Sequence, residues 1–328
     1  MPGRISGATQ LKHLGIRGYT RFSVLYFLPV WWYNTLYSIK DVFPLKKLLS
    51  NPIVNKYVIP GLTILFAAVF LVSAGLTADY LIKSHKHKKM MESLSQLVQD
   101  NNTGTDNITD YTNVTMDETF TLPEHSKFTK VVHPKTNKTL LIQTKYVDLF
   151  NLNPDLVGWI FIHGTEVNYP VMQSPEWVNY YLYRDFYGQD SKHGSIYVDE
   201  MANIQTSANL TIYGHKMKDN SMFASLHQYK EKSFYDQYPT VDFNTIYEDR
   251  TYQIFAVFIT TANEGGFPYH LFVDGTEEEF NAYVAKCKEL SLYDTGVEVA
   301  YGDKLITLST CEHNVSNGRY VVVAKQVS

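Results

Sequence analysis

The sequence has little cysteine: among its 328 residues only Cys287 and Cys311 carry a thiol. Two cysteines cannot form the disulfide framework of a small secreted domain, so any folded domain here must be stabilised by its core. The metal-binding spacings CxxC and HExxH are also absent, and no metal site is predicted. A thiol in such a chain is a candidate for chemistry.

The main body of the chain also lacks a basic surface. Residues 1–83 carry nine Lys or Arg and two Asp, a net charge of +7, whereas residues 84–328 carry a net charge of −11. Nucleic-acid binding requires Lys and Arg to neutralise phosphates, so the acidic body argues against nucleic acid as a partner. The excess of Lys and Arg in residues 1–83 is explained by an apolar run within the same region, since basic residues commonly flank membrane segments.

A run of 21 residues without a charge, Val58–Ala78, is long enough to cross a hydrocarbon core of about 30 Å. A buried helix of a soluble protein is usually shorter and carries a polar stripe. The run begins too far from residue 1 for a cleaved signal peptide. We therefore predict a transmembrane helix over residues 58–82, with membrane lipid as its partner.

The charges around this helix predict its orientation. Residues 40–56 hold four Lys and one Asp and should stay cytoplasmic, which places the large C-terminal part outside the cell. A second apolar stretch, Phe22–Ile39, contains Pro29 and two Trp, and either lies in the headgroup region or forms another span. Residues 1–57 are thus a cytoplasmic or interfacial segment of a membrane protein.

The remaining chain divides into two parts of different composition. Between about Met90 and Ser126 the chain becomes rich in Asn, Thr and Asp, which predicts a solvated extracellular stalk over residues 83–130. Residues 131–328 contain short β-branched and aromatic runs between turn residues, the pattern of a mostly β sandwich or barrel. The eight expected strands lie near residues 158–163, 167–172, 195–199, 209–215, 240–248, 252–260, 304–311 and 319–327.

Three helices are expected among these strands: Tyr146–Asn153, Ser221–Tyr229 and Thr276–Leu290. The third begins with Thr followed by three Glu, a favourable helix N-terminus. Its apolar residues, which include Cys287, recur at helical spacing, so Cys287 is predicted to pack rather than react.

The C-terminal stretch KLITLSTCEHNVSNGRYVVVAKQV carries the chemistry. An alternating strand ends at Cys311, a polar loop follows, and a second strand begins at Arg319. Pairing of these strands would bring the thiol and the guanidinium to one rim. A thiol needs a partner that favours the thiolate or accepts its proton, and Arg supplies a fork of donors suited to an oxyanion.

The residues alone leave the acid–base group open between two histidines. His215 ends a strand as Cys311 does, and Gly214 before it permits close backbone approach. His313 is two residues from the thiol, but it lies in the loop, where its ring can point to water. His163 and His227 show no evident link to the thiol in the sequence.

The segments YGHKM, TLSTC and NGRYVVVAK, in this order, resemble the signature of sortases. Further segments, such as NPDLVGWIFIHGTEVNYPVMQ, are similar to the class B branch. The resemblance covers about residues 145–328. It implies a closed eight-stranded β-barrel with peripheral helices, preceded by the membrane helix, and it favours His215 over His313.

The resemblance also implies a reaction. Cys311 would attack the carbonyl after a Thr in the C-terminal sorting signal of a secreted protein and form a thioacyl enzyme. His215 would protonate the departing amine and deprotonate an amine of a cell-wall peptide, while Arg319 would stabilise the oxyanion. No cofactor is implied. The expected product is a surface protein joined to the cell wall.

By their position relative to the sortase motifs, four residues are expected to line the substrate groove: Leu182, Ser309, Glu312 and Tyr269. Two departures affect the same region. Residues 177–179 read Trp-Val-Asn where class B enzymes commonly have an Asp-Asn pair, and His270 stands where Ile often follows the groove Tyr. The sorting motif therefore stays open.

Three other functions compete with wall anchoring. A pilin-polymerising enzyme would use a pilin Lys amine as acceptor. A Cys–His protease would hydrolyse its acyl intermediate. An inactive barrel adhesin is disfavoured by the intact Cys, His and Arg set.

Overall fold

The computed structural model describes residues 51–101, 122, 126–174 and 176–328, and the chain divides into two units, Met1–Asp79 and Tyr80–Ser328. The apolar stretch Phe22–Ile39, expected to lie in or across the membrane, falls outside the described residues.

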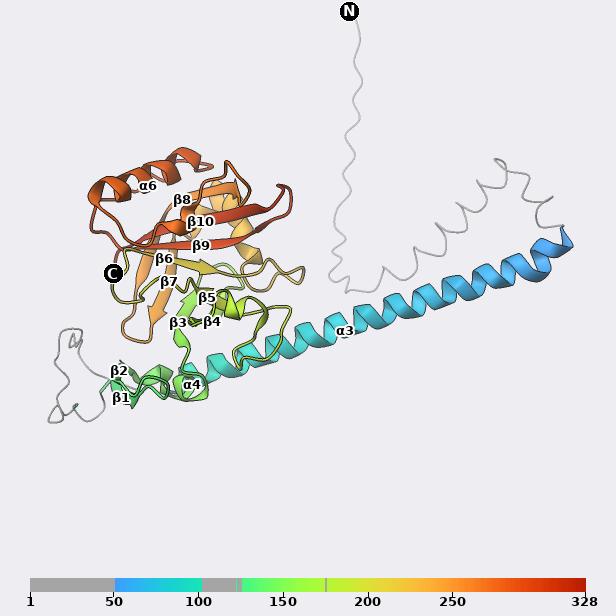
Figure 1. Cartoon of the computed structure of the whole chain (residues 1–328), viewed down its shortest axis with the longest axis horizontal. Coiled ribbons are helices and arrows are strands. Elements are labelled where there is room, and N and C mark those ends of the chain that lie inside the picture. The colour runs from blue at the N-terminus through green and yellow to red at the C-terminus, as the bar shows by residue number, and fades with distance from the viewer. Residues whose placement is uncertain (1–50, 102–121, 123–125, 175) are drawn as a thin grey trace, which may run out of the picture. The chain divides into compact units, whose positions relative to one another are not determined.

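The described part of the first unit is helical. A π-helical turn, η1 (Val54–Val58), continues directly into helix α3 (Ile59–Asp100) (Figure 1). The apolar side chains of this stretch are exposed, and the hydroxyls of Thr63 and Thr77 donate to the carbonyls one turn earlier. Such internal bonding suits a helix in lipid, where water is absent. This helix is long and apolar enough to cross a membrane.

Helix α3 continues beyond residue 82, where the predicted membrane span ends, to Asp100. Residues 83–100, expected in the stalk, are therefore helical. Their Lys, Met, Glu, Leu and Gln residues are good helix formers, and polar composition alone does not end a helix. The Asn-Asn-Thr-Gly sequence at residues 101–104 supplies poor helix formers only after that point.

The part of α3 that belongs to the second unit buries two of its own side chains, His87 and Leu94. The His87 ring stacks on His193 with centroids 4.4 Å apart, and His193 Nε2 lies 3.2 Å from an Asp219 oxygen. Neither nitrogen of His87 has a hydrogen-bond partner. Burial, followed by the charge of His193, lowers the pKa of His87 to about 4, so it packs as a neutral ring.

Eight strands close into a barrel in the order β10-β8-β7-β3-β4-β5-β6-β9. They are β3 (Leu156–Phe161), β4 (Asn168–Met172), β5 (Ile196–Val198), β6 (Asn209–Tyr213), β7 (Thr240–Thr245), β8 (Thr251–Thr261), β9 (Leu305–Glu312) and β10 (Gly318–Gln326). All eight expected strands are confirmed, and closure confirms the barrel. The pairs β4–β5 and β6–β9 are parallel, and the other pairs in the barrel are antiparallel.

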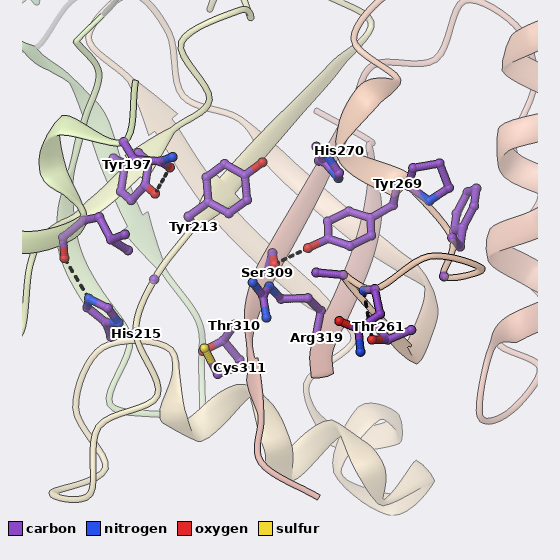
Figure 2. A pocket seen from close by; sticks show the side chains of 18 of the residues that line it. Tyr197, Tyr213, His215, Thr261, Tyr269, His270, Ser309, Thr310, Cys311 and Arg319 are labelled. Carbon is purple, nitrogen blue, oxygen red and sulfur yellow. Dashed lines mark hydrogen bonds between the residues drawn. The ribbon is translucent and has the colours of Figure 1, made fainter. Parts of the chain in front are cut away.

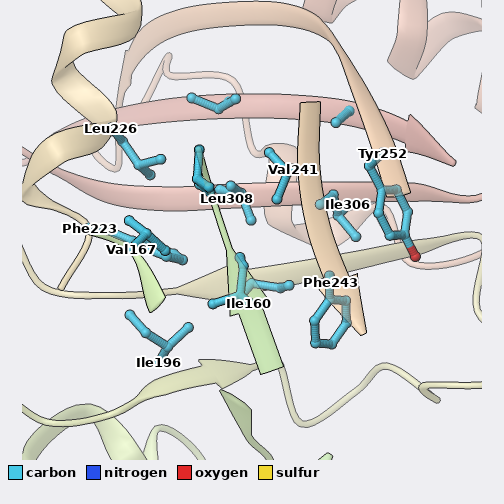
Figure 3. Close-up of a cluster of buried hydrophobic side chains, with 14 of the residues drawn as sticks. Ile160, Val167, Ile196, Phe223, Leu226, Val241, Phe243, Tyr252, Ile306 and Leu308 are labelled. Carbon is cyan, nitrogen blue, oxygen red and sulfur yellow. The ribbon is translucent and has the colours of Figure 1, made fainter. Parts of the chain in front are cut away.

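The barrel interior is filled by apolar side chains from alternating strand positions. Ile160, Phe243, Ile306 and Leu308 are fully buried in one cluster (Figure 3). Each such side chain contributes roughly 1.5–3 kcal/mol when it leaves water. Because side chains alternate in period two, this burial also determines which residues of each strand face outward.

Helices cover the outside of the barrel. The expected helices correspond to α4 (Val147–Leu152), the 3₁₀ helix η4 (Ala224–Lys230) and α6 (Glu277–Leu290). Thr276 and Glu279 form a capping box at the start of α6. Helix α6 lies over β8, β9 and β10 (Figure 1) and packs through Phe280, Val284 and Cys287.

Several short elements were not predicted: β1 (Phe128–Val132), β2 (Thr139–Gln143), η2 (Thr144–Tyr146), η3 (Tyr180–Tyr183), α5 (Lys232–Gln237) and η5 (Tyr269–Leu271). Strands β1 and β2 form an antiparallel hairpin, with Asn137 in the left-handed region at φ 55° in its turn. The turn between the two strands, residues 133–138, has the polar composition of a linker, so the pairing could not be predicted from the sequence.

The packing of His87 predicts a pH-dependent attachment of the last turns of α3. The pKa of His87 is lower when buried than its ordinary 6.5, so between pH 6.5 and pH 4 only the undocked ring gains a proton. Protection of amides 84–98 against hydrogen exchange, measured on the full chain in micelles, should fall about tenfold from pH 7.5 to 5.5.

The variant His87→Phe keeps a stacked ring without a titratable group, and it should lose most of this fall. An equal fall in both proteins would contradict the role of His87.

Candidate active site

Two parallel strands bring His215 and Cys311 to the same rim of the barrel. Tyr213, the last residue of β6, pairs with Ser309 of β9, and two residues further along the chain lie His215, just past β6, and Cys311, within β9. The Gly214 N–H still donates to the Ser309 carbonyl at 3.1 Å. The parallel alignment therefore continues to the point where the two side chains emerge.

Arg319 reaches the same rim from the other edge of β9. In the antiparallel β9–β10 pair it stands directly opposite Cys311, so both side chains project from one face (Figure 2). Its Nη1 donates to the carbonyls of Asn317 and Gly318 at 3.2 and 3.1 Å. A guanidinium has five N–H donors, so others remain for an oxyanion.

The three side chains line one cleft of about 550 Å³ (Figure 2). Three of the four predicted groove residues, Leu182, Ser309 and Tyr269, line the same cleft. The hydroxyl oxygens of Tyr269 and Ser309 lie 2.6 Å apart in a hydrogen bond. Burial raises the pKa of Tyr269, so its hydroxyl is neutral.

Glu312, the fourth predicted groove residue, does not line the cleft. It follows Cys311 on an extended strand, and successive side chains point to opposite faces. Its carboxylate is buried at 2% exposure and pairs with Lys230 at 2.6 Å and His227 at 3.2 Å. Strand alternation therefore turns Glu312 away from the cleft that the other three predicted groove residues line.

The imidazole of His215 is held by a backbone carbonyl. Its Nε2 lies 2.7 Å from the Leu182 oxygen, and a carbonyl only accepts, so Nε2 carries the proton and Nδ1 is available for chemistry. Burial lowers the pKa of His215, partly offset by this bond, so the ring is neutral at pH 7. A Cβ on Gly214 would lie 2.5 Å from Ile196 and 2.7 Å from the Phe223 ring, which explains the glycine.

The alternatives to these groups lie elsewhere. His313 and His163 are exposed and do not line the cleft. Cys287 is fully buried, and burial raises its pKa to about 12, so it packs in the protein rather than reacts. Cys311 is half-buried at the rim. Within the described part of the chain, no group of three metal-ligating side chains is present.

Several further polar groups of the cleft were not predicted from the sequence. Asn179 adopts a left-handed conformation at φ 52° and accepts a hydrogen bond from the Tyr197 hydroxyl at 2.7 Å. Tyr213 donates to Asp199 at 2.9 Å. Asn179 lies in the segment that departs from the class B pattern, and that departure was the available signal.

An eight-stranded barrel with thiol, imidazole and guanidinium at one cleft defines an enzyme-like fold with a cysteine as its candidate nucleophile. A family model described as the sortase domain matches residues 160–327. The chain is 36% identical over 197 residues to sortase B of Listeria monocytogenes, covering 59% of this chain and 78% of that protein. It is 32% identical over 191 residues to sortase B of Staphylococcus aureus, covering 56% and 75%. The chain belongs to the sortase family, in its class B branch.

Solved structures agree with this assignment. A Staphylococcus aureus sortase B–substrate complex matches with a TM-score of 0.58 and 26% identity, covering 75% of this chain and 99% of that one. Sortase B of Bacillus anthracis in complex with AAEK1 matches with a TM-score of 0.57 and 26% identity, covering 76% and 99%.

The geometry predicts different effects for the two rival histidines. If His215 is the acid–base group that the sortase resemblance implies, His215→Ala should lower the rate of sorting-peptide cleavage by about a hundredfold or more. His313→Ala should change this rate by no more than about twofold, because the side chain lies outside the cleft. Steady-state kinetics with a Thr-containing peptide measures both, and a collapse of activity in His313→Ala would overturn the choice of His215.

Proposed function

We propose that this chain is a membrane-anchored cysteine transpeptidase that joins secreted proteins to the cell wall. The observation that carries the proposal is the convergence of Cys311, His215 and Arg319 on one cleft from three neighbouring strands. Their roles in the reaction are those that the sortase resemblance implies.

The first half of the reaction forms a thioester. His215 Nδ1 takes the proton of Cys311, and Sγ attacks the carbonyl carbon after the Thr of the sorting signal. The carbonyl oxygen becomes an oxyanion, which donors of Arg319 stabilise. When the oxyanion collapses, the C–N bond breaks and His215 gives its proton to the departing amine.

The second half reverses these steps with a new amine. The amine of a cell-wall peptide enters the cleft, and its nitrogen attacks the thioester carbon while His215 removes a proton. The C–S bond then breaks, the thiol regains the proton, and a new amide forms. Because burial lowers the pKa of His215, the imidazole is neutral at pH 7 and ready to accept each proton.

The lining of the cleft supports binding of an extended peptide signal. Leu182 offers an apolar contact, while Ser309 and Tyr269 offer hydroxyl groups already joined to one another. Asn179 and His270 line the same cleft at the two positions that depart from the class B pattern. We expect these two residues to alter the preferred sorting motif without altering the chemistry.

The proposed location of the protein in the membrane rests on the apolar part of α3 and on the charged residues that flank it. Residues 58–82 would span the membrane, with the basic residues 40–56 on the cytoplasmic side and residues 131–328 outside the cell. This orientation would expose the cleft to secreted proteins and to cell-wall peptides.

Replacing the guanidinium tests the role of Arg319. Arg319→Lys keeps the charge but loses the planar fork, so kcat should fall about a hundredfold with a smaller change in KM. Steady-state peptide cleavage at saturating amine measures both constants. Near-normal kcat in this variant would refute the oxyanion role.

The choice of acceptor tests the transpeptidase itself. A peptide containing Thr-Gly, incubated with the full chain and a glycine-based amine, should give the amide product in preference to the free acid. Mass spectrometry distinguishes the two, and Cys311→Ala serves as the control that forms neither. Only free acid at saturating amine would identify a protease instead, and preference for a Lys side-chain amine would identify a pilin polymerase.

A further inference from the structure

The residues that come directly after His215, Cys311 and Arg319 in the chain lie in one common environment. Each candidate lies at the end of an extended segment, where the next side chain points to the opposite face of the barrel wall. These next residues are Lys216, Glu312 and Tyr320. All three contact a single side chain behind the cleft, His227.

The contacts of His227 are short and involve its ring directly. Its Nε2 lies 3.1 Å from Lys216 Nζ and 3.2 Å from a Glu312 oxygen. Its ring stacks on the Tyr320 ring, with centroids 4.4 Å apart and an angle of 22° between the planes. His227 therefore joins the three segments that carry the catalytic side chains, although it does not line the cleft itself.

The element that carries His227 is well fixed. Helix η4 is held by Leu226 and Tyr229, both fully buried in the barrel core (Figure 3 shows Leu226). At its start the Phe223 N–H donates to the His215 carbonyl at 2.9 Å. A side chain on a fixed element can hold a neighbouring strand end in place.

The charges around His227 make its environment sensitive to substitution. Burial would raise the pKa of Glu312, but hydrogen bonds from Lys230 and from the Asn314 backbone lower it to about 2. The carboxylate is thus charged at 2% exposure and needs its partners. Burial and then the Lys216 charge lower the pKa of His227, which is therefore neutral at pH 7.

We propose that His227 is a positioning residue that aligns the His215, Cys311 and Arg319 side chains through the residues that follow them. This inference rests on the proposed function for its kinetic readout. His227 acts on the far side of the wall, so it should affect kcat rather than peptide binding. Small displacements of reacting groups have large effects on rate.

Two substitutions at His227 separate its polar contacts from its packing. His227→Phe keeps the stacked ring on Tyr320 but loses the Nε2 atom that contacts Lys216 and Glu312. His227→Gln keeps a donor and an acceptor but loses the ring. For His227→Phe we expect kcat to fall roughly ten- to a hundredfold, with KM within about twofold of the original. For His227→Gln we expect kcat to recover to within about fivefold.

The matched control is His313→Gln, an exposed histidine on the loop after Cys311, whose kcat should change by no more than about twofold. All variants are measured as the full chain, with thermal unfolding followed in parallel. The rate of Cys311 alkylation by iodoacetamide is a second readout, which needs no peptide or amine. It should fall in His227→Phe and recover in His227→Gln.

Three outcomes would overturn the proposal: kcat of His227→Phe within about twofold of the original, a loss explained by a smaller folded fraction, or equal losses in both variants. Failure of the proposed function is distinguishable from these. In that case the unaltered chain would not transfer peptide to amines, while the alkylation comparison would still test the alignment.

Discussion

The site depends on the pairing of β9 on both of its edges. Parallel pairing with β6 brings His215 beside Cys311, and antiparallel pairing with β10 brings Arg319 opposite the thiol. A slip of one residue along either edge would turn Cys311 to the other face of the wall. Burial of Ile306 and Leu308 in the same strand opposes such a slip, because a slip would remove both side chains from the barrel core.

The same alternation gives the barrel wall two chemically different faces at its rim. On the cleft side lie a thiol, an imidazole and a guanidinium. On the other side, Glu312 is buried among Lys230 and His227. Breaking the Glu312–Lys230 pair would leave a buried carboxylate without its partner, so this contact can hold the end of β9 in place.

Helix α3 combines two environments in one continuous element. Its first turns expose apolar side chains, as expected for lipid contact, and its last turns bury His87 and Leu94 within the second unit. The helix is continuous because the polar residues after Ala78 are still good helix formers. Composition indicates where the surroundings change, and helix propensity determines where the element ends.

The sequence by itself determined the eight strands, the capped helix at Thr276 and the thiol and guanidinium at Cys311 and Arg319, because these follow from local periodicity and neighbouring positions. It could not separate His215 from His313 without the family resemblance, and it left His227 without a role. Those assignments need the parallel β6–β9 pairing, which joins residues almost a hundred positions apart. Only tertiary structure brings such distant residues together, since local pattern carries no information on which strands become neighbours.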